Sequence, residues 1–170
     1  VSINALQFNR HDSCVYVATD SGLYRFKDKS PEKIKVIVHN RPSVLQRMFF
    51  DHQNQLWIVT GTNELGIYEM SSSHFYPVNP AIGNAAIQKI TEDNQHHIWL
   101  ATNGGGVLQL SVDKDYKTTT TLLLNRKTGL RDDAVQDIAF GTGDDLWIVG
   151  SGGLTRAYTH KQNKQGNMLC

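Results

Sequence analysis

The sequence predicts an all-β protein built from four repeats of similar length. Apolar and β-branched residues gather in short runs separated by turns, and no run keeps the apolar spacing of a helix over about ten residues or more. The second position of one such run is aromatic in every repeat, and these positions are 41, 42 and 48 residues apart: Tyr16, Trp57, Trp99 and Trp147. A period of about 40 to 50 residues indicates a repeat architecture.

The first strand of each repeat is expected to carry two apolar residues three positions apart. Such pairs precede each tryptophan at a constant distance, and in the first repeat the match requires one extra residue in the turn that follows. The pairs are Leu45 and Met48, Ile87 and Ile90, Val135 and Ile138, with Ile3 and Leu6 in the first repeat.

Three further strands complete each repeat. The aromatic run forms the second strand, and a third strand follows the turn after it. The fourth is a variable β-rich segment at 33–39, 73–78 or 118–124, whereas the last repeat ends at 161–170 without a recognisable fourth strand.

The second strands indicate how these sheets pack. LWIV and IWLA are apolar at consecutive positions, so both faces of the strand must be covered. A sandwich would leave one polar face on each strand, and a parallel β-helix would have a shorter period. The prediction is therefore a single β-propeller fragment of about four blades of four antiparallel strands, with the last blade incomplete, and with blades at about 1–40, 41–80, 81–130 and 131–170.

We expect the four aromatic residues to form a structural core between neighbouring blades: Tyr16, Trp57, Trp99 and Trp147. A carbohydrate-stacking platform is the alternative, but their place inside continuous apolar runs favours packing. The glycines of NGGG at 103–106 lead into a strand rather than into a helix, which favours a tight turn over a phosphate loop.

The repeats resemble the two-component regulator propeller repeats. The resemblance lies in the spacing within 129–138 followed by Leu146-Trp147-Ile148, and within 87–93 followed by 98–105. It implies an extracytoplasmic, periplasmic sensor module of bacterial hybrid histidine kinases or related diguanylate-cyclase proteins. The module itself would be non-catalytic, with any kinase or cyclase output domain outside this chain.

Candidate ligand-binding residues lie in two sets of loops, those after the second strands and those between blades. Their amide, hydroxyl and charged groups suit a polar small molecule or a glycan. The candidates are Asn40, Arg41, Asn63, Glu64, Asn103, Arg131, Asp132 and Ser151. Two alternatives stay open: a propeller-scaffold enzyme acting as a lyase or on glycans, and a protein-interaction platform.

Composition argues against several other classes of function. The net charge of +1 gives no basis for nucleic-acid binding, and no apolar run approaches a membrane span. The two cysteines have no metal-ligand spacing, and the side chains of His96 and His97 are expected to point in opposite directions. We expect no metal, no cofactor, no membrane contact by this segment, and no catalytic residue.

An open propeller fragment should expose apolar faces on its first and last sheets, together with unpaired strand edges. We therefore expect self-association through these edges, or packing against the remaining blades of a parent chain.

Overall fold

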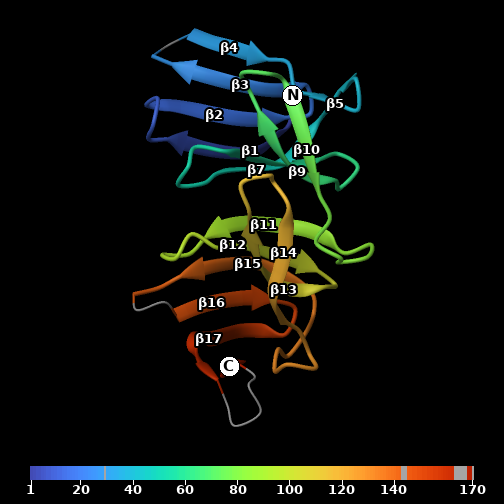
Figure 1. The fold of residues 1–170 in the computed structure, drawn as a ribbon, viewed down its shortest axis with the longest axis vertical. Coiled ribbons are helices and arrows are strands. Elements are labelled where there is room, and N and C mark those ends of the chain that lie inside the picture. The colour runs from blue at the N-terminus through green and yellow to red at the C-terminus, as the bar shows by residue number, and fades with distance from the viewer. Residues whose placement is uncertain (29, 143–144, 163–167, 170) are drawn as a thin grey trace. The chain divides into compact units, whose positions relative to one another are not determined.

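The computed structural model describes residues 1–28, 30–142, 145–162 and 168–169. Its regular elements are β-strands, which form four antiparallel four-stranded sheets and one two-stranded hairpin (Figure 1). The predicted all-β architecture of four antiparallel sheets is thus confirmed. Among the described residues there is no helix with the length and apolar character needed to cross a membrane. The chain divides into two compact units, Val1–Asn79 and Pro80–Cys170.

Unit 1 contains the first two sheets, each a simple meander. The first sheet has β1 (Ile3–Asn9), β2 (Cys14–Thr19), β3 (Gly22–Lys27) and β4 (Ser30–Ile34). The second sheet has β7 (Leu45–Phe50), β8 (Leu56–Thr60), β9 (Leu65–Glu69) and β10 (His74–Val78). Between them lies the hairpin of β5 (Ile37–Val38) and β6 (Arg41–Pro42).

The prediction for the fourth strand of the first repeat was wrong in its position. The strand expected at 33–39 is β4, which begins at Ser30 and ends at Ile34. The apolar residues at the end of the expected strand belong instead to β5. The reason is local: His39 and Asn40 adopt the left-handed region, with φ of 49° and 62°, which folds the chain back into a two-residue hairpin turn.

Unit 2 contains the third and fourth sheets. The third sheet has β11 (Ala86–Glu92), β12 (Ile98–Asn103), β13 (Gly106–Val112) and β14 (Thr118–Leu124). The fourth has β15 (Val135–Phe140), β16 (Asp145–Gly150), β17 (Gly153–Gln162) and β18 (Met168–Leu169). The segment 161–170, predicted to lack a fourth strand, therefore supplies a two-residue one; its residues 163–167 and 170 lie outside the described residues.

A β-bulge explains the spacing of three between the apolar residues of each first strand. On a regular strand that spacing would place the two side chains on opposite faces of the sheet. In all four sheets the register shifts directly after the first of the two residues, which are Ile3, Leu45, Ile87 and Val135. The extra residue returns both side chains to one face. The pairing also confirms Ile3 and Leu6 as the equivalents in the first sheet.

In unit 1 the two sheets pack through the apolar residues of β2 and β3 on one side and β7 on the other. We call the first set an aromatic face and the second a leading row. The aromatic face of the first sheet is Tyr16, Ala18 and Leu23, and the leading row of the second sheet is Leu45, Met48 and Phe50. The rings of Tyr16 and Phe50 meet with their centroids 4.7 Å apart.

Unit 2 repeats this contact between its own two sheets. The aromatic face of the third sheet is Trp99, Ala101 and Val107, and the leading row of the fourth is Val135, Ile138 and Phe140. Here the rings of Trp99 and Phe140 are 5.6 Å apart and nearly perpendicular. The two units therefore use the same pairing of aromatic face and leading row.

Trp147 is a correction to the predicted core. The other three aromatic residues are buried, with 1% of Tyr16 and 0% of Trp57 and Trp99 exposed, whereas Trp147 is 38% exposed. Within each unit, the ring at this position in the first of the two sheets is covered by the leading row of the second, as Phe50 covers Tyr16 and Phe140 covers Trp99. Within the described chain no sheet follows the fourth, so nothing of that kind covers Trp147.

Candidate functional site

In unit 1 the hairpin β5–β6 and the turn after β8 lie against each other. The His39 imidazole Nε2 lies 3.0 Å from Oε1 of Glu64, and Oε2 of Glu64 accepts a hydrogen bond from the Thr62 hydroxyl at 3.0 Å. The hairpin carries the predicted residues Asn40 and Arg41, both exposed. The structure thus joins the two predicted loop sets in this unit through His39, a residue that sequence reasoning did not select.

The neighbouring strand β9 anchors this hairpin. The Tyr68 hydroxyl donates to the carbonyl oxygen of Lys35 at 3.2 Å and accepts from the amide of Ile37 at 3.4 Å. Asn63, another predicted residue, has φ of 65°, and its amide donates to the carbonyl oxygen of Thr60. The backbone of this loop pair is therefore fixed, while Asn40 and Arg41 stay at the surface.

In unit 2 three predicted loops converge on one short segment. Asn103 forms an isolated antiparallel bridge with Ala134, and the Ser151 amide donates to the Ala134 carbonyl oxygen at 3.1 Å. Ala134 follows Arg131 and Asp132 in the connection between the third and fourth sheets. The turns after β12 and β16 and the connection between the sheets therefore form one surface, which we call the Ala134 loop cluster: residues 103–106, 131–134 and 150–153.

Three side chains of this cluster are available to a ligand. Asn103, Arg131 and Ser151 are exposed, and they make no side-chain hydrogen bond or ion pair with any other residue the structure describes. Asp132 is more constrained, because its Oδ1 accepts the amide of Ala134 at 3.1 Å. The cluster thus offers one guanidinium, one amide and one hydroxyl group together with a partly engaged carboxylate.

Backbone packing rather than anion binding explains the glycines of this cluster. The amides of Gly104 and Gly106 both donate to the carbonyl oxygen of Asp133 at 2.9 Å, so they are not available to a phosphate. Gly106 has φ of 77°, and a Cβ there would lie 2.1 Å from the carbonyl oxygen of Leu124. The Thr102 hydroxyl closes the turn by donating to the carbonyl oxygen of Gly106 at 2.8 Å.

Asp133 is a polar residue of this cluster that the sequence does not mark as a candidate, although it holds the cluster together. Besides accepting the two glycine amides through its carbonyl oxygen, it accepts the Arg126 amide through Oδ1 at 2.7 Å. The sequence predicts its neighbours Arg131 and Asp132 as candidates because they are polar residues of a loop between blades. Nothing in the residue type alone distinguishes the carboxylate that holds the loop from one that faces a ligand.

The third sheet carries a hairpin turn between β11 and β12, at the end opposite the Ala134 loop cluster, and Asp93 holds this turn. Oδ1 of Asp93 accepts the amides of Gln95 and His97 at 2.9 Å, while Oδ2 lies near Nε1 of Trp99 and Nδ1 of His97. Burial acts to raise the pKa of the Asp93 carboxyl, but the hydrogen bonds from Trp99 and His97 outweigh it and leave the pKa below its usual value. This end of the sheet is a closed structural turn.

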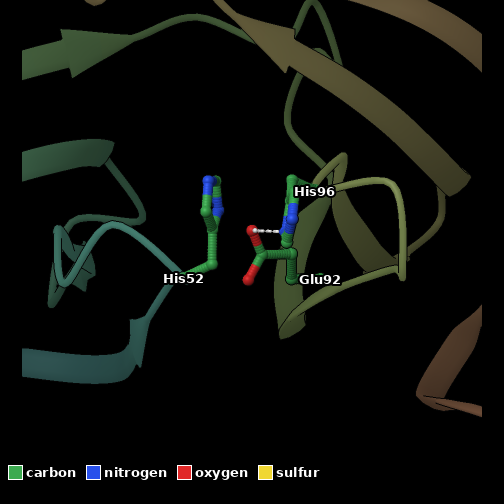
Figure 2. A group of neighbouring side chains, drawn as sticks. All are labelled: His52, Glu92 and His96. Atoms are coloured by element: carbon green, nitrogen blue, oxygen red, sulfur yellow. Dashed lines mark ion pairs between the residues drawn. The ribbon is translucent and has the colours of Figure 1, made fainter. Parts of the chain in front are cut away.

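His96 and His97 each pair with a different carboxylate. Figure 2 shows the ion pair between His96 Nδ1 and Glu92 Oε1, which are 3.4 Å apart; His52, also labelled there, belongs to unit 1. His97 Nδ1 instead lies 3.0 Å from Oδ2 of Asp93. The two adjacent imidazoles therefore serve separate contacts, in keeping with side chains that point in opposite directions.

Comparisons with known proteins agree on the fold. No family model matches the chain, and no curated protein matches its sequence. The chain is similar to the extracellular domain of BT4673, described as a hybrid two component system of B. thetaiotaomicron, with a TM-score of 0.70 and 19% identity over 95% of this chain and 22% of that one. For the corresponding domain of BT3049 from the same organism, the TM-score is 0.63 and the identity 18%, over 91% and 20% of the two chains.

A structure of catalytically inactive virginiamycin B lyase from Staphylococcus aureus with quinupristin is also similar, with a TM-score of 0.69 and 14% identity over 98% of this chain and 54% of that one. The chain spans only about a fifth of the length of the two extracellular domains. The WD40 β-propeller domain of Doa1 is similar as well, with a TM-score of 0.72 and 10% identity over 95% of this chain and 52% of that one. At these identities the likeness shows the fold alone, and it confirms that the four sheets are β-propeller blades.

Proposed function

We propose that this chain is a non-catalytic, ligand-binding propeller segment in the extracytoplasmic sensor of a bacterial two-component-type signalling protein. The observation that carries the proposal is the Ala134 loop cluster, in which Asn103, Arg131 and Ser151 present unengaged polar groups on a fixed backbone. The likeness to the extracellular domains of two-component systems supports the sensory role.

The ligand class follows from the chemistry of these groups. A guanidinium, an amide and a hydroxyl group on rigid loops suit hydroxyl-rich or carboxylate-bearing ligands, because each group can donate hydrogen bonds and only the guanidinium carries charge. Unit 1 separately exposes Asn40 and Arg41, which have the same character. A glycan, neutral or acidic, is therefore the ligand we propose.

A glycan array probed with the purified chain tests this function. We expect retention of a subset of neutral or uronic-acid oligosaccharides, without any change in their mass after prolonged incubation. Release of shortened or unsaturated products would instead favour the propeller-scaffold enzyme. Binding to no oligosaccharide on the array would contradict a glycan ligand.

A further inference from the structure

Two apolar faces of the described chain have no partner within it. The leading row of the first blade is exposed, by 69% at Ile3, 66% at Leu6 and 53% at Phe8. The aromatic face of the fourth blade is exposed as well, by 38% at Trp147, 40% at Val149 and 61% at Leu154. These six side chains are strand residues on sheets whose other faces are packed, so their exposure is not that of a loose loop.

The strand register shows that these faces are the two halves of one contact. Ile3 pairs with Thr19 and Phe8 with Val15, just as Leu45 pairs with Thr60 and Phe50 with Leu56. The leading row of the first blade is therefore equivalent to the buried leading row of the second.

The same holds for the aromatic face of the fourth blade. Trp147 pairs with Arg156 and Val149 with Leu154, as Trp99 pairs with Gln109 and Ala101 with Val107 in the third blade. The face of the third blade is covered by the leading row that follows it. The fourth blade presents a similar face, with a shallow cavity of about 100 Å³ lined by Trp147, Val149 and Leu154 together with Asp137, Ile138 and Ala139.

We propose that the leading row of one copy of this chain packs on the aromatic face of a second copy. Phe8 of one molecule would then lie against Trp147 of the other, as Phe50 lies against Tyr16 and Phe140 against Trp99. A second copy fits because one chain carries both halves of the contact, and each half already has a buried counterpart inside the chain. This proposal does not depend on the identity of the ligand.

The charge near the aromatic face does not oppose such docking. Two charged residues lie near this face, and both are paired. The Arg156 guanidinium lies 5.3 Å from the Trp147 ring centroid and is paired with Asp145, while Oδ1 of Asp137, which lines the cavity, lies 3.6 Å from Nζ of Lys89. In the third blade Gln109 occupies the equivalent position and reaches Oδ2 of Asp93 at 3.4 Å. Docking would therefore cover an arginine whose charge is already compensated, which avoids the cost of an unpaired buried charge.

The contact is heterologous, because different faces of the two copies meet. This predicts an outcome that a symmetric contact would not give. A variant with a damaged leading row and a variant with a damaged aromatic face should each fail to self-associate. Mixed together, they should form a one-to-one complex through the two intact faces, and that complex should not grow further.

Sedimentation velocity over a wide range of concentration tests this with Leu6→Asp and Leu154→Asp. We expect the wild type to associate, and each variant alone to associate at least about tenfold more weakly. Their equimolar mixture should form a heterodimer. Leu123→Asp, which changes an exposed leucine outside both faces, is the matched control and should associate like the wild type. Circular dichroism melts establish that each variant is folded.

Three results would overturn the proposal: a wild type that stays monomeric at every concentration, a folded single variant that self-associates as strongly as the wild type, or a mixture that stays monomeric. A second readout is acrylamide quenching of tryptophan fluorescence. Because Trp57 and Trp99 are buried, Trp147 supplies the quenchable emission, and Trp147→Phe should abolish it. Quenching of the wild type should fall as association proceeds; quenching that is independent of concentration contradicts the contact at Trp147.

Discussion

The indole Nε1–H of Trp99 donates a hydrogen bond to Oδ2 of Asp93 over 2.8 Å. The second repeat has the same bond between Trp57 and Asp51 at 2.9 Å, and in the first repeat the Tyr16 hydroxyl donates to Asp12 at 2.7 Å. One aspartate therefore closes the hairpin turn and fixes the aromatic ring of the second strand. This explains why an aspartate stands a few residues before the aromatic position in these three repeats.

Asp93→Asn should lower the free energy of unfolding by about 1 to 3 kcal/mol at neutral pH, because an amide cannot accept the Trp99 and His97 hydrogens as a carboxylate does. Urea denaturation measures this. Asp113→Asn is the matched control: Oδ1 of Asp113 caps the amides of Asp115 and Lys117, and no side chain in the described structure donates to Oδ2. Asp113→Asn should lower the free energy of unfolding by less than about 0.5 kcal/mol. Equal losses would contradict the role of the Trp99 bond.

The effect of Asp93→Asn should also depend on pH. The pKa of Asp93 is lowered in the folded state, so its contribution is present above the unfolded pKa and is lost as the pH falls through the folded value. The stability difference between wild type and Asp93→Asn should therefore shrink as the pH falls from about 5 to about 2. Repeating the urea titrations across this range tests it, and a constant difference would show that the carboxylate charge is irrelevant.

The Tyr16 hydroxyl should ionise at a higher pH than an exposed tyrosine does. Burial and the hydrogen bond to Asp12 raise the pKa of Tyr16 to about 12. The stability that this bond contributes is fully present below the unfolded tyrosine pKa and is lost as the pH rises through the folded value. Ultraviolet difference titration of wild type against Tyr16→Phe should give a midpoint near that value. A midpoint at the ordinary tyrosine pKa would mean that the hydroxyl is neither buried nor bound.

Gly106→Ala should destabilise the protein by more than about 2 kcal/mol, because the position combines a left-handed φ with a Cβ clash on the Leu124 carbonyl oxygen. Gly104→Ala is the control, since it has φ of 104° but no atom within 4 Å of the added Cβ. It should cost only about 1 kcal/mol, from backbone strain alone. Thermal melts compare the two. Similar losses would show that the close approach of the backbones at Gly106 does not matter.

The repeat pattern predicts those features that every repeat shares. The pairing of Ile3 and Leu6 with their strand neighbours follows from the sequence period, and so do the four antiparallel sheets. Features that depend on a neighbouring sheet outside the repeat cannot be predicted from the repeat pattern. Trp147 has the same sequence surroundings as Trp99, but its burial depends on the leading row of another sheet.

The sequence predicts where the loops lie, but it does not predict which contacts their residues make. Their polar residues mark the turns after the second strands, because strands of this pattern end where the apolar run ends. The sequence does not show that His39 pairs with Glu64, since these residues belong to different elements and meet only through the β5–β6 hairpin. The role of Asp133 as acceptor for two glycine amides is a backbone contact, which side-chain identity does not encode.

Calorimetric titration of an oligosaccharide retained on the array tests the central claim, that the Ala134 loop cluster binds the ligand. We predict that Asn103→Ala combined with Arg131→Ala weakens binding by at least about tenfold through lost hydrogen bonds. Lys114→Ala combined with Asp115→Ala, in the exposed turn at the other end of β13, should leave affinity unchanged. Unchanged affinity in the first pair, or an equal loss in the second, would contradict the account.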